Sequence, residues 1–278
     1  MIDDEFEQHR GQLFGIAYRM VGSAMEAEDI VQDAYLRIRT ANDVRAPSAY
    51  LRKTVVRLCL DHLKSAAAQR ETYIGAWLPE PLPTPDDLHG VELESISMAF
   101  LTLLETLSPV ERAVFLLREV FDYEYDEIAD IIGREAAACR QILHRAKTHI
   151  AAHRPRFQPD AAAHQTMLLK FVTAMTTGDL NGLTSLLAAD AVSYSDGGGK
   201  AQAATRPIVG ADAIARFFVG IGKRVTSDYA GELRTLNGQP AVVVRQNGVA
   251  FWVLILDLDG DKIGTVRVVV NPDKLRGL

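Results

Sequence analysis

Cationic and amide side chains recur at helical spacing in one short stretch, and their chemistry suits nucleic acid. The set is Arg134, Arg140, Gln141, His144, Arg145 and Lys147. Basic side chains bind phosphate oxygens, whereas Arg and Gln also form paired hydrogen bonds with base edges in the major groove. Glu135 is the only acidic residue from position 134 to 156. The pattern favours a DNA-binding helix. For this segment taken alone, an ordinary solvent-exposed helix face is the alternative interpretation.

A second basic segment runs from Arg45 to Arg70, and Asp61 is its only acidic residue. Acidic residues gather at positions 26–33 and 119–130. The chain has 30 Lys and Arg against 36 Asp and Glu, a net charge of -6, which by itself argues against nucleic-acid binding. The separation of the charges instead predicts surfaces for different partners.

Residues that could perform catalysis or bind metal are few. In the last third of the chain the candidates are Tyr194, Asp196 and Asp228, and no histidine follows His164. Cys59 and Cys139 lack the spacing of a zinc site or a disulfide framework. We therefore expect no catalytic residue, no metal site and no cofactor, and two reduced thiols.

The length and the apolar pattern limit the architecture. With 278 residues, 48% of them hydrophobic, the chain is long enough for two or three folded domains. No basic stretch followed by an apolar run opens it, and no apolar run is long enough to span a bilayer. We expect a cytoplasmic protein with no membrane contact.

The first 70 residues predict a helical domain. Ser23 and Glu26 form a capping-box pattern at the start of a helix. Apolar residues between positions 27 and 38 then recur at helical spacing, which leaves Asp29, Gln32 and Asp33 on an exposed acidic face. A second helix is predicted from Pro47 to Arg70.

Residues 71–94 predict a stiff linker, because prolines at positions 79, 81, 83 and 85 exclude a continuous helix. Trp77 and Leu78 are too apolar for a solvated tether, so we expect them to dock on a folded surface.

Residues 95–158 predict a second helical domain. Ser108 and Glu111 form another capping box, with Pro109 at the first helical position. Gly133 can end the short helix that precedes it, and a basic helix follows over residues 135–153. This order is typical of a helix-turn-helix, and a plain helical hairpin is the alternative.

Residues 160–278 predict an α+β domain with a curved antiparallel sheet. A helix over residues 161–177 is followed by strands at 242–245, 250–256 and 262–270. Turn signals lie at Asn237-Gly238, Asn247-Gly248 and Asp259-Gly260.

Five segments together resemble a known family. They are residues 27–35 (AEDIVQDAY), 73–81 (YIGAWLPEP), 124–147 with CRQ and HRA, 196–200 (DGGGK) and 271–275 (NPDKL). The first and third resemble regions 2 and 4 of extracytoplasmic-function sigma factors, and the others resemble signatures of the SigJ-like group. The C-terminal domain is similar to SnoaL-like, NTF2-type cones.

The resemblance implies partners for each surface. Asp29, Gln32 and Asp33 would bind core RNA polymerase. The basic helix with Arg52, Lys53, Arg57 and Lys64 would follow the minus-ten promoter element. Arg140 and Gln141 would contact base edges of the minus-thirty-five element, and Arg134, His144, Arg145 and Lys147 its phosphates. At position 135 such sigma factors often have a serine or threonine, whereas this chain has Glu135. The resemblance therefore does not determine the exact start of the recognition helix or its phosphate contacts.

The resemblance also implies that the C-terminal domain regulates the sigma factor in cis. The expected contacts are Trp77, Leu78, Asp196, Gly197, Gly198, Gly199, Lys200, Asn271, Pro272 and Asp273. The glycines let the backbone approach a neighbouring surface closely. Alternatives are a sensor with a small apolar ligand in the cone, an isomerase or cyclase, and a ligand-responsive regulator that binds operators without polymerase.

Overall fold

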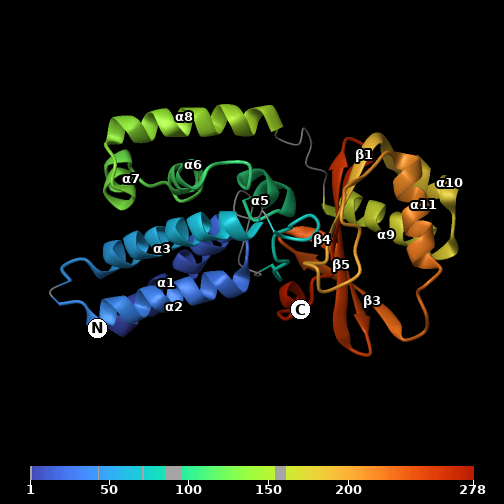
Figure 1. Cartoon of the computed structure of the whole chain (residues 1–278), viewed down its shortest axis with the longest axis horizontal. Helices are drawn as coiled ribbons and strands as arrows, with labels where there is room; N and C mark the ends of the chain where they lie inside the picture. The colour runs from blue at the N-terminus through green and yellow to red at the C-terminus, as the bar shows by residue number, and fades with distance from the viewer. Residues whose placement is uncertain (1, 43, 71, 85–94, 154–160) are drawn as a thin grey trace. The chain divides into compact units, whose positions relative to one another are not determined.

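The computed structural model describes residues 2–42, 44–70, 72–84, 95–153 and 161–278 (Figure 1). The chain forms two compact units. The helical unit contains residues 1–72 and 100–154, and the sheet unit contains residues 73–99 and 155–278. The linker segment therefore folds with the C-terminal residues. Residues 85–94 of the predicted linker lie outside the described residues.

The N-terminal half of the helical unit consists of α1 (Ile2–Val21), α2 (Ala24–Thr40) and α3 (Pro47–Arg70), which pack side by side (Figure 1). Ser23 starts α2, because its hydroxyl accepts the backbone N–H of Glu26 at 3.4 Å. The five apolar residues of α2 that recur at helical spacing are buried, as this spacing predicts: Ala27, Ile30, Val31, Ala34 and Ile38.

The second half contains α5 (Met98–Leu104), α6 (Pro109–Phe115), the π-helical turn η1 (Leu116–Val120), α7 (Tyr125–Ile132) and α8 (Ala136–His153). The predicted capping box of Ser108 and Glu111 is present in both directions. Gly133 ends α7 at φ 70° and ψ 43°, a left-handed conformation that glycine adopts without steric cost. The predicted helix-turn-helix order is confirmed, and α8 begins one residue after Glu135.

Arg112 of α6 connects the two halves of the helical unit. Its guanidinium is buried, and Nη1 donates to the carbonyl of Met20 at 2.5 Å and to Glu105 Oε1 at 2.6 Å. Burial lowers the pKa of Arg112 to about 10, so the group stays charged at neutral pH. A buried charge is tolerated only when it is paired in this way.

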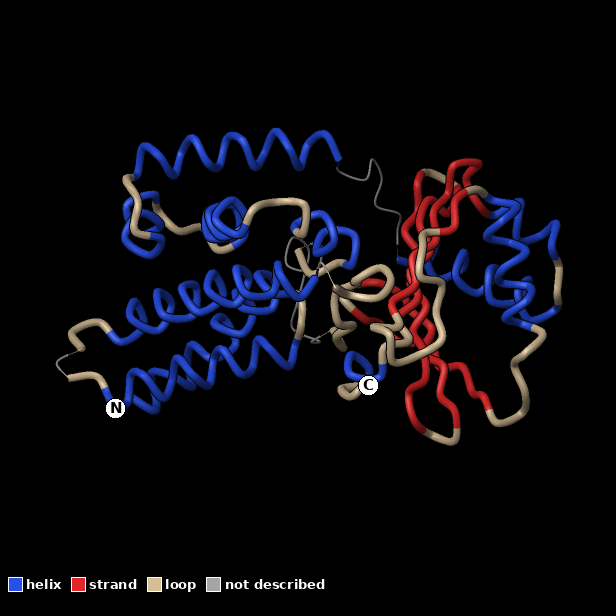
Figure 2. Tube along the Cα trace, in the orientation of Figure 1, coloured by secondary structure: helices blue, strands red, loops and turns tan. Residues whose placement is uncertain are grey.

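The sheet unit consists of α9 (Ala161–Thr177), α10 (Leu180–Leu186), α11 (Ala211–Gly222), a short 3₁₀ helix η2 (Pro272–Leu275) and a mixed sheet. The strands are β1 (Leu187–Asp196), β2 (Ile208–Val209), β3 (Tyr229–Leu236), β4 (Gln239–Gln246), β5 (Val249–Asp259) and β6 (Lys262–Val269). Their order is β2-β1-β6-β5-β4-β3. Figure 2 shows the strands in red and the helices in blue.

The expected α+β class is confirmed, but the sheet is not wholly antiparallel. Tight turns connect the consecutive strands β3, β4, β5 and β6. Each of these strands therefore pairs with the next in antiparallel orientation. Strand β1, which was not predicted, pairs in parallel with β6. In the predicted turns Asn237-Gly238 and Asn247-Gly248 all four residues have positive φ, from 51° to 83°, as a type I′ hairpin requires.

Both faces of the sheet are covered. On one face the helices α9 and α11 contribute Phe171 and Phe218 to a core with Trp252 and Leu254. The opposite face packs against Leu78 of the linker, Met98 at the start of α5 and Leu275 of η2. The expected docking of the linker therefore occurs on the sheet face that the helices leave open.

We predict that His164 makes the stability of the sheet unit depend on pH. His164 is buried, its Nε2 lies 2.8 Å from the carbonyl oxygen of Leu256, and burial lowers its pKa. A lowered folded-state pKa gives stability that is present above the unfolded pKa of about 6.5 and lost as the pH falls through the folded pKa. His164→Gln should flatten this acid destabilisation.

The measurement is thermal unfolding followed by tryptophan fluorescence at neutral and mildly acidic pH. The only tryptophans, Trp77 and Trp252, both lie in the sheet unit, so the signal reports on this unit alone. Equal acid sensitivity in wild type and His164→Gln would show that His164 is not the responsible group.

Candidate functional site

The acidic face of α2 is exposed as predicted. Asp29, Gln32 and Asp33 are all exposed, and they lie between two exposed apolar side chains, Met25 and Leu36, each 50% accessible. Sequence analysis did not single out Met25 and Leu36, although their helical spacing from Asp29 and Gln32 places them on the same face. A charged ridge flanked by exposed apolar groups is suited to bind another protein.

The predicted DNA-contacting residues of α8 share its exposed side. Arg134, just before the helix, and Arg140, Gln141, His144, Arg145 and Lys147 are exposed. The buried side packs through Cys139, Ile142, Leu143 and Ala146. Arg145 Nε lies 3.6 Å from Glu111, and Lys147 Nζ lies 2.7 Å from Glu119. These two cations therefore have carboxylate partners within the helical unit, which reduces the positive potential they offer to phosphate.

The cations of α3 contact the segment that leads into and forms α7. Lys53 Nζ donates to both carboxylate oxygens of Asp130, at 2.8 and 2.9 Å. The hydrogen bonds from Lys53 lower the pKa of Asp130, so its carboxylate is ionised at neutral pH. Arg57 Nε donates to the carbonyl of Ile131 at 3.2 Å.

Arg52 completes this contact, with its guanidinium carbon 5.4 Å from the centre of the Tyr123 ring. The fourth predicted residue, Lys64, lies farther along α3 and pairs with Asp61 at 3.0 Å. Three of the four cations predicted to follow promoter DNA therefore contact residues 123–131, and the fourth pairs within α3.

In the sheet unit, the buried carboxylate of Asp196 holds the linker. It is fully buried at the end of β1, and it accepts the backbone N–H of Leu78 at 2.8 Å and the Lys274 ammonium at 2.7 Å. Lys274 also donates to the carbonyl of Leu78. We call this group of residues, together with Tyr73 and Trp77, the linker anchor.

Tyr73 and Trp77 complete the linker anchor. The Tyr73 hydroxyl donates to Asp196 Oδ1 at 2.5 Å, and burial together with this bond raises the pKa of Tyr73. The Lys274 ammonium lies 4.1 Å from the centre of the Trp77 ring, a cation–π distance. Sequence analysis named Trp77, Leu78 and Asp196 but missed Tyr73 and Lys274, both of which lie inside the resembling motifs.

The glycine run allows the close approach that its composition predicts. A Cβ on Gly198 would lie 2.4 Å from the Asn271 side chain and 3.0 Å from the Tyr73 hydroxyl, and a Cβ on Gly199 would lie 2.9 Å from Ile74. Both glycines also have positive φ. Gly197 has no room for a side chain either, because a Cβ would lie 2.5 Å from the Ala201 carbonyl.

The remaining predicted regulatory residues support the linker anchor from outside. Asn271 Nδ2 donates to the Tyr73 hydroxyl at 3.0 Å, and Pro272 begins η2. Lys200 pairs with Asp273, which also accepts from Arg276 at 2.7 Å. Lys200 is largely exposed.

A second attachment lies at the hairpin turn between β3 and β4. The Asn237 side chain accepts the Leu82 N–H at 2.9 Å and donates to the Ile96 carbonyl at 2.9 Å. Pro83 forms an isolated antiparallel bridge with Leu236. The β3–β4 hairpin therefore binds the chain both before and after residues 85–94.

The residues considered for catalysis do not form a common site. Asp196 belongs to the linker anchor, and Tyr194 packs at the edge of the core beneath the linker. Asp228 is exposed and accepts from Gln246 at 2.9 Å. Asp196 is fully buried, and its carboxylate accepts from three donors of the protein itself.

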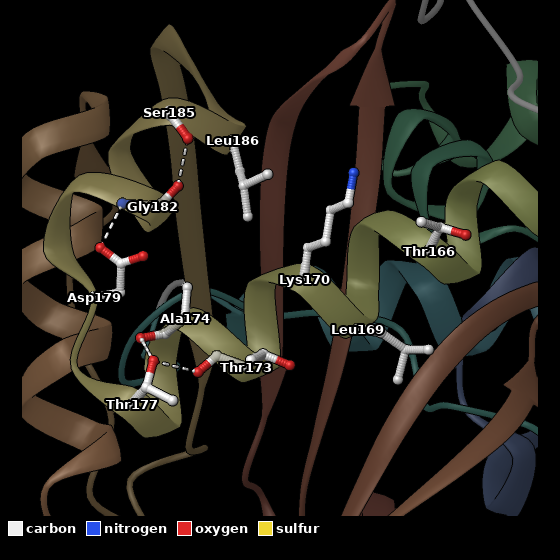
Figure 3. A pocket seen from close by; sticks show the side chains of 10 residues that line it. All are labelled: Thr166, Leu169, Lys170, Thr173, Ala174, Thr177, Asp179, Gly182, Ser185 and Leu186. Carbon is white, nitrogen blue, oxygen red and sulfur yellow. Dashed lines mark hydrogen bonds between the residues drawn. The ribbon is translucent and has the colours of Figure 1, made fainter.

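A surface pocket of about 480 Å³ lies between α9 and α10. Figure 3 shows its lining, in which Lys170 of α9 and Asp179 before α10 are accompanied by threonine and serine hydroxyls. Most of these side chains are exposed. The pocket is on the outer side of the helices, not in the apolar core where a small ligand was considered.

Among the described residues, no helix is long and apolar enough to span a membrane. The same residues contain no group of His, Cys, Asp and Glu side chains that could hold a metal ion.

Comparison with known proteins decides the family. Residues 6–69 match Sigma-70 region 2, and residues 97–150 match Sigma-70, region 4. The chain is 35% identical to the ECF RNA polymerase sigma factor SigJ of Mycobacterium tuberculosis, over 98% of this chain and 93% of SigJ. The chain belongs to the extracytoplasmic-function (ECF) sigma factors.

The likeness includes the sheet unit. The crystal structure of Mycobacterium tuberculosis SigJ superimposes with a TM-score of 0.77 and 31% identity, covering 99% of this ECF sigma factor and 98% of SigJ. The probable ECF RNA polymerase sigma factor SigI of the same species is 34% identical over 96% of this chain and 92% of SigI. The expected family is therefore confirmed along nearly the whole chain.

We predict that Lys274→Met destabilises the sheet unit and releases the linker. Removing one member of a buried ion pair leaves the other charge uncompensated, which costs about 3–5 kcal/mol. The matched control is Lys200→Met. Its exposed pair with Asp273 contributes about 0–1 kcal/mol.

Denaturant unfolding monitored by tryptophan fluorescence gives the stability, and limited proteolysis gives the accessibility of the linker. Similar losses of stability in the two variants would contradict the importance of the buried pair.

Proposed function

We propose that this ECF sigma factor exists in a closed state, in which region 4 covers the DNA-binding helix of region 2 and the sheet unit holds the linker between them. As a sigma factor the chain binds core RNA polymerase and directs promoter-specific transcription initiation. Closure and linker docking would be its means of regulation in cis. The observation that best supports this proposal is the engagement of Arg52, Lys53 and Arg57 by residues 123–131.

Competition for the same cations is the basis of the closed state. Lys53 cannot donate fully to Asp130 and to a phosphate at once, and Arg57 faces the same choice between the Ile131 carbonyl and DNA. The exposed ion pair of Lys53 and Asp130 contributes about 0–1 kcal/mol, so phosphate can replace it when polymerase and promoter bind. Full separation of the two halves would also break the buried hydrogen bond from Arg112 to Met20. The minus-ten contacts of Arg52, Lys53, Arg57 and Lys64 then replace the internal ones.

The exposed face of α8 is proposed to bind the minus-thirty-five element. Arg140 and Gln141 lie in its N-terminal half, the part of a recognition helix that contacts base edges. Arg134, His144, Arg145 and Lys147 would contact phosphates. The exposed acid Glu135 immediately before α8 would repel a phosphate placed close to its carboxylate.

The face of α2 is proposed to bind core polymerase. Asp29, Gln32 and Asp33 would align α2 on the polymerase surface by charge complementarity. Met25 and Leu36 would be buried in the interface. An operator-binding regulator that works without polymerase would have no use for this exposed face.

The sheet unit is proposed to act as a regulatory module and not as an enzyme. Its buried carboxylate is used to hold the linker, and its core is filled by aromatic and aliphatic side chains. A small ligand that binds the sheet unit could shift the balance between docked and released linker, which keeps the sensor hypothesis compatible with the proposal.

We predict that Asp130→Ala strengthens binding to single-stranded minus-ten DNA by about two- to fivefold, because it releases Lys53. The matched control is Asp126→Ala, which removes the same charge from an exposed position on the same helix. Fluorescence anisotropy with a labelled non-template oligonucleotide is the measurement. If both variants bind equally tightly, the effect is one of net charge and the closed-state proposal fails.

We predict that reversing the charge at Asp29 and Asp33 with lysine abolishes stable co-elution with core RNA polymerase. Lysine at exposed Glu7 of α1 is the control, because it changes a surface charge outside the α2 face. Size-exclusion chromatography of the mixed proteins measures binding. Undiminished co-elution of the Asp29 and Asp33 variant would remove the α2 face from the polymerase interface.

A further inference from the structure

Tyr125 lies where neither core packing nor helix capping explains an aromatic residue. It is the first residue of α7 and is half-buried. Capping at this helix start is provided by Glu124 and Glu127. The hydrophobic side of α7 is formed by Ile128 and Ile131.

The Tyr125 ring is shared by two guanidinium groups. The guanidinium carbons of Arg118 and Arg140 each lie 5.3 Å from the ring centre. Arg118 precedes the helix-turn-helix, and Arg140 lies in the second turn of α8. Both distances are within the roughly 6 Å range of a cation–π interaction.

Arg118 is itself fixed, so the ring is part of a rigid platform. Its Nη1 donates to the Tyr123 carbonyl at 2.8 Å and to Glu124 at 3.1 Å, and it lies 3.7 Å from Asp122. The two carboxylates compensate the charge of Arg118, and a second cation can therefore share the ring. Of the two arginines, Arg140 is the exposed one.

An exposed arginine on a recognition helix ordinarily samples many rotamers, and ordering it costs conformational entropy when DNA binds. Contact with an aromatic ring reduces this cost, because the side chain is held before binding. A guanidinium held over a ring can still donate its N–H groups at its edge to the two acceptors of guanine.

We propose that Tyr125 is a positioning residue for promoter recognition, which holds Arg140 in the conformation that contacts a guanine of the minus-thirty-five element. This inference rests on the proposed role of Arg140 as a base-contacting residue. It adds that the sequence preference of α8 depends on a ring in α7 that need not touch DNA.

The test is selection of a promoter library randomised at the minus-thirty-five element, using full-length protein with core RNA polymerase. Arg140→Ala identifies the base pair that Arg140 contacts, as the position where preference is lost. Tyr125→Leu should weaken preference at that base pair alone, by about two- to fivefold. Tyr125→Phe, which keeps the ring, should retain the wild-type preference.

Double variants separate positioning from a general structural effect. Tyr125→Leu should have no additional effect in the Arg140→Ala background, whereas its effect should add to that of Arg145→Ala, whose side chain pairs with Glu111. Co-elution with core polymerase checks that each variant is folded.

Three outcomes would overturn the inference. If Arg140→Ala changes no preference, the proposed base contact itself fails, and the role of Tyr125 with it. If Arg140→Ala removes a preference that Tyr125→Leu leaves intact, only the positioning role fails. Equal weakening at every base pair by Tyr125→Leu would make the ring a general structural residue.

Discussion

The buried ion pair between Asp196 and Lys274 is the constraint on which the sheet unit depends. Two charges removed from water are stable only if each is paired and its remaining hydrogen-bonding positions are filled. Leu78 fills them from the linker backbone, and Tyr73 and Trp77 add a hydroxyl and an aromatic face. Release of the linker would therefore expose an incompletely satisfied pair, so linker docking and folding of the sheet unit are coupled.

The helical unit uses charge in the opposite way. The Lys53–Asp130 ion pair between α3 and α7 is exposed at its carboxylate, and water or phosphate can replace that partner at little cost. A strong attachment in one unit and a weak one in the other suit a regulated sigma factor.

Local signals made much of the fold predictable from sequence. The N-cap at Ser23, the capping box at Ser108, the glycine end of α7 and the Asn-Gly turns all appear where expected, because a few neighbouring residues determine them. Strand β1 was not predicted, since it pairs in parallel with β6, which is distant in sequence, and no hairpin turn joins the two strands. Lys274 was missed because a lysine near the chain's end suggests a solvated residue, and only the fold brings it to Asp196. The pairing of Lys53 with Asp130 likewise needed the tertiary structure.

The most direct test of regulation in cis is promoter-specific run-off transcription by full-length protein and core RNA polymerase. It should compare wild type, Lys274→Met and Lys200→Met under conditions where all three remain folded. The account predicts that Lys274→Met changes the yield of the promoter-specific transcript, whereas Lys200→Met matches wild type. Identical yields from all three proteins, with the linker of Lys274→Met released, would contradict the claim that the sheet unit regulates through the linker.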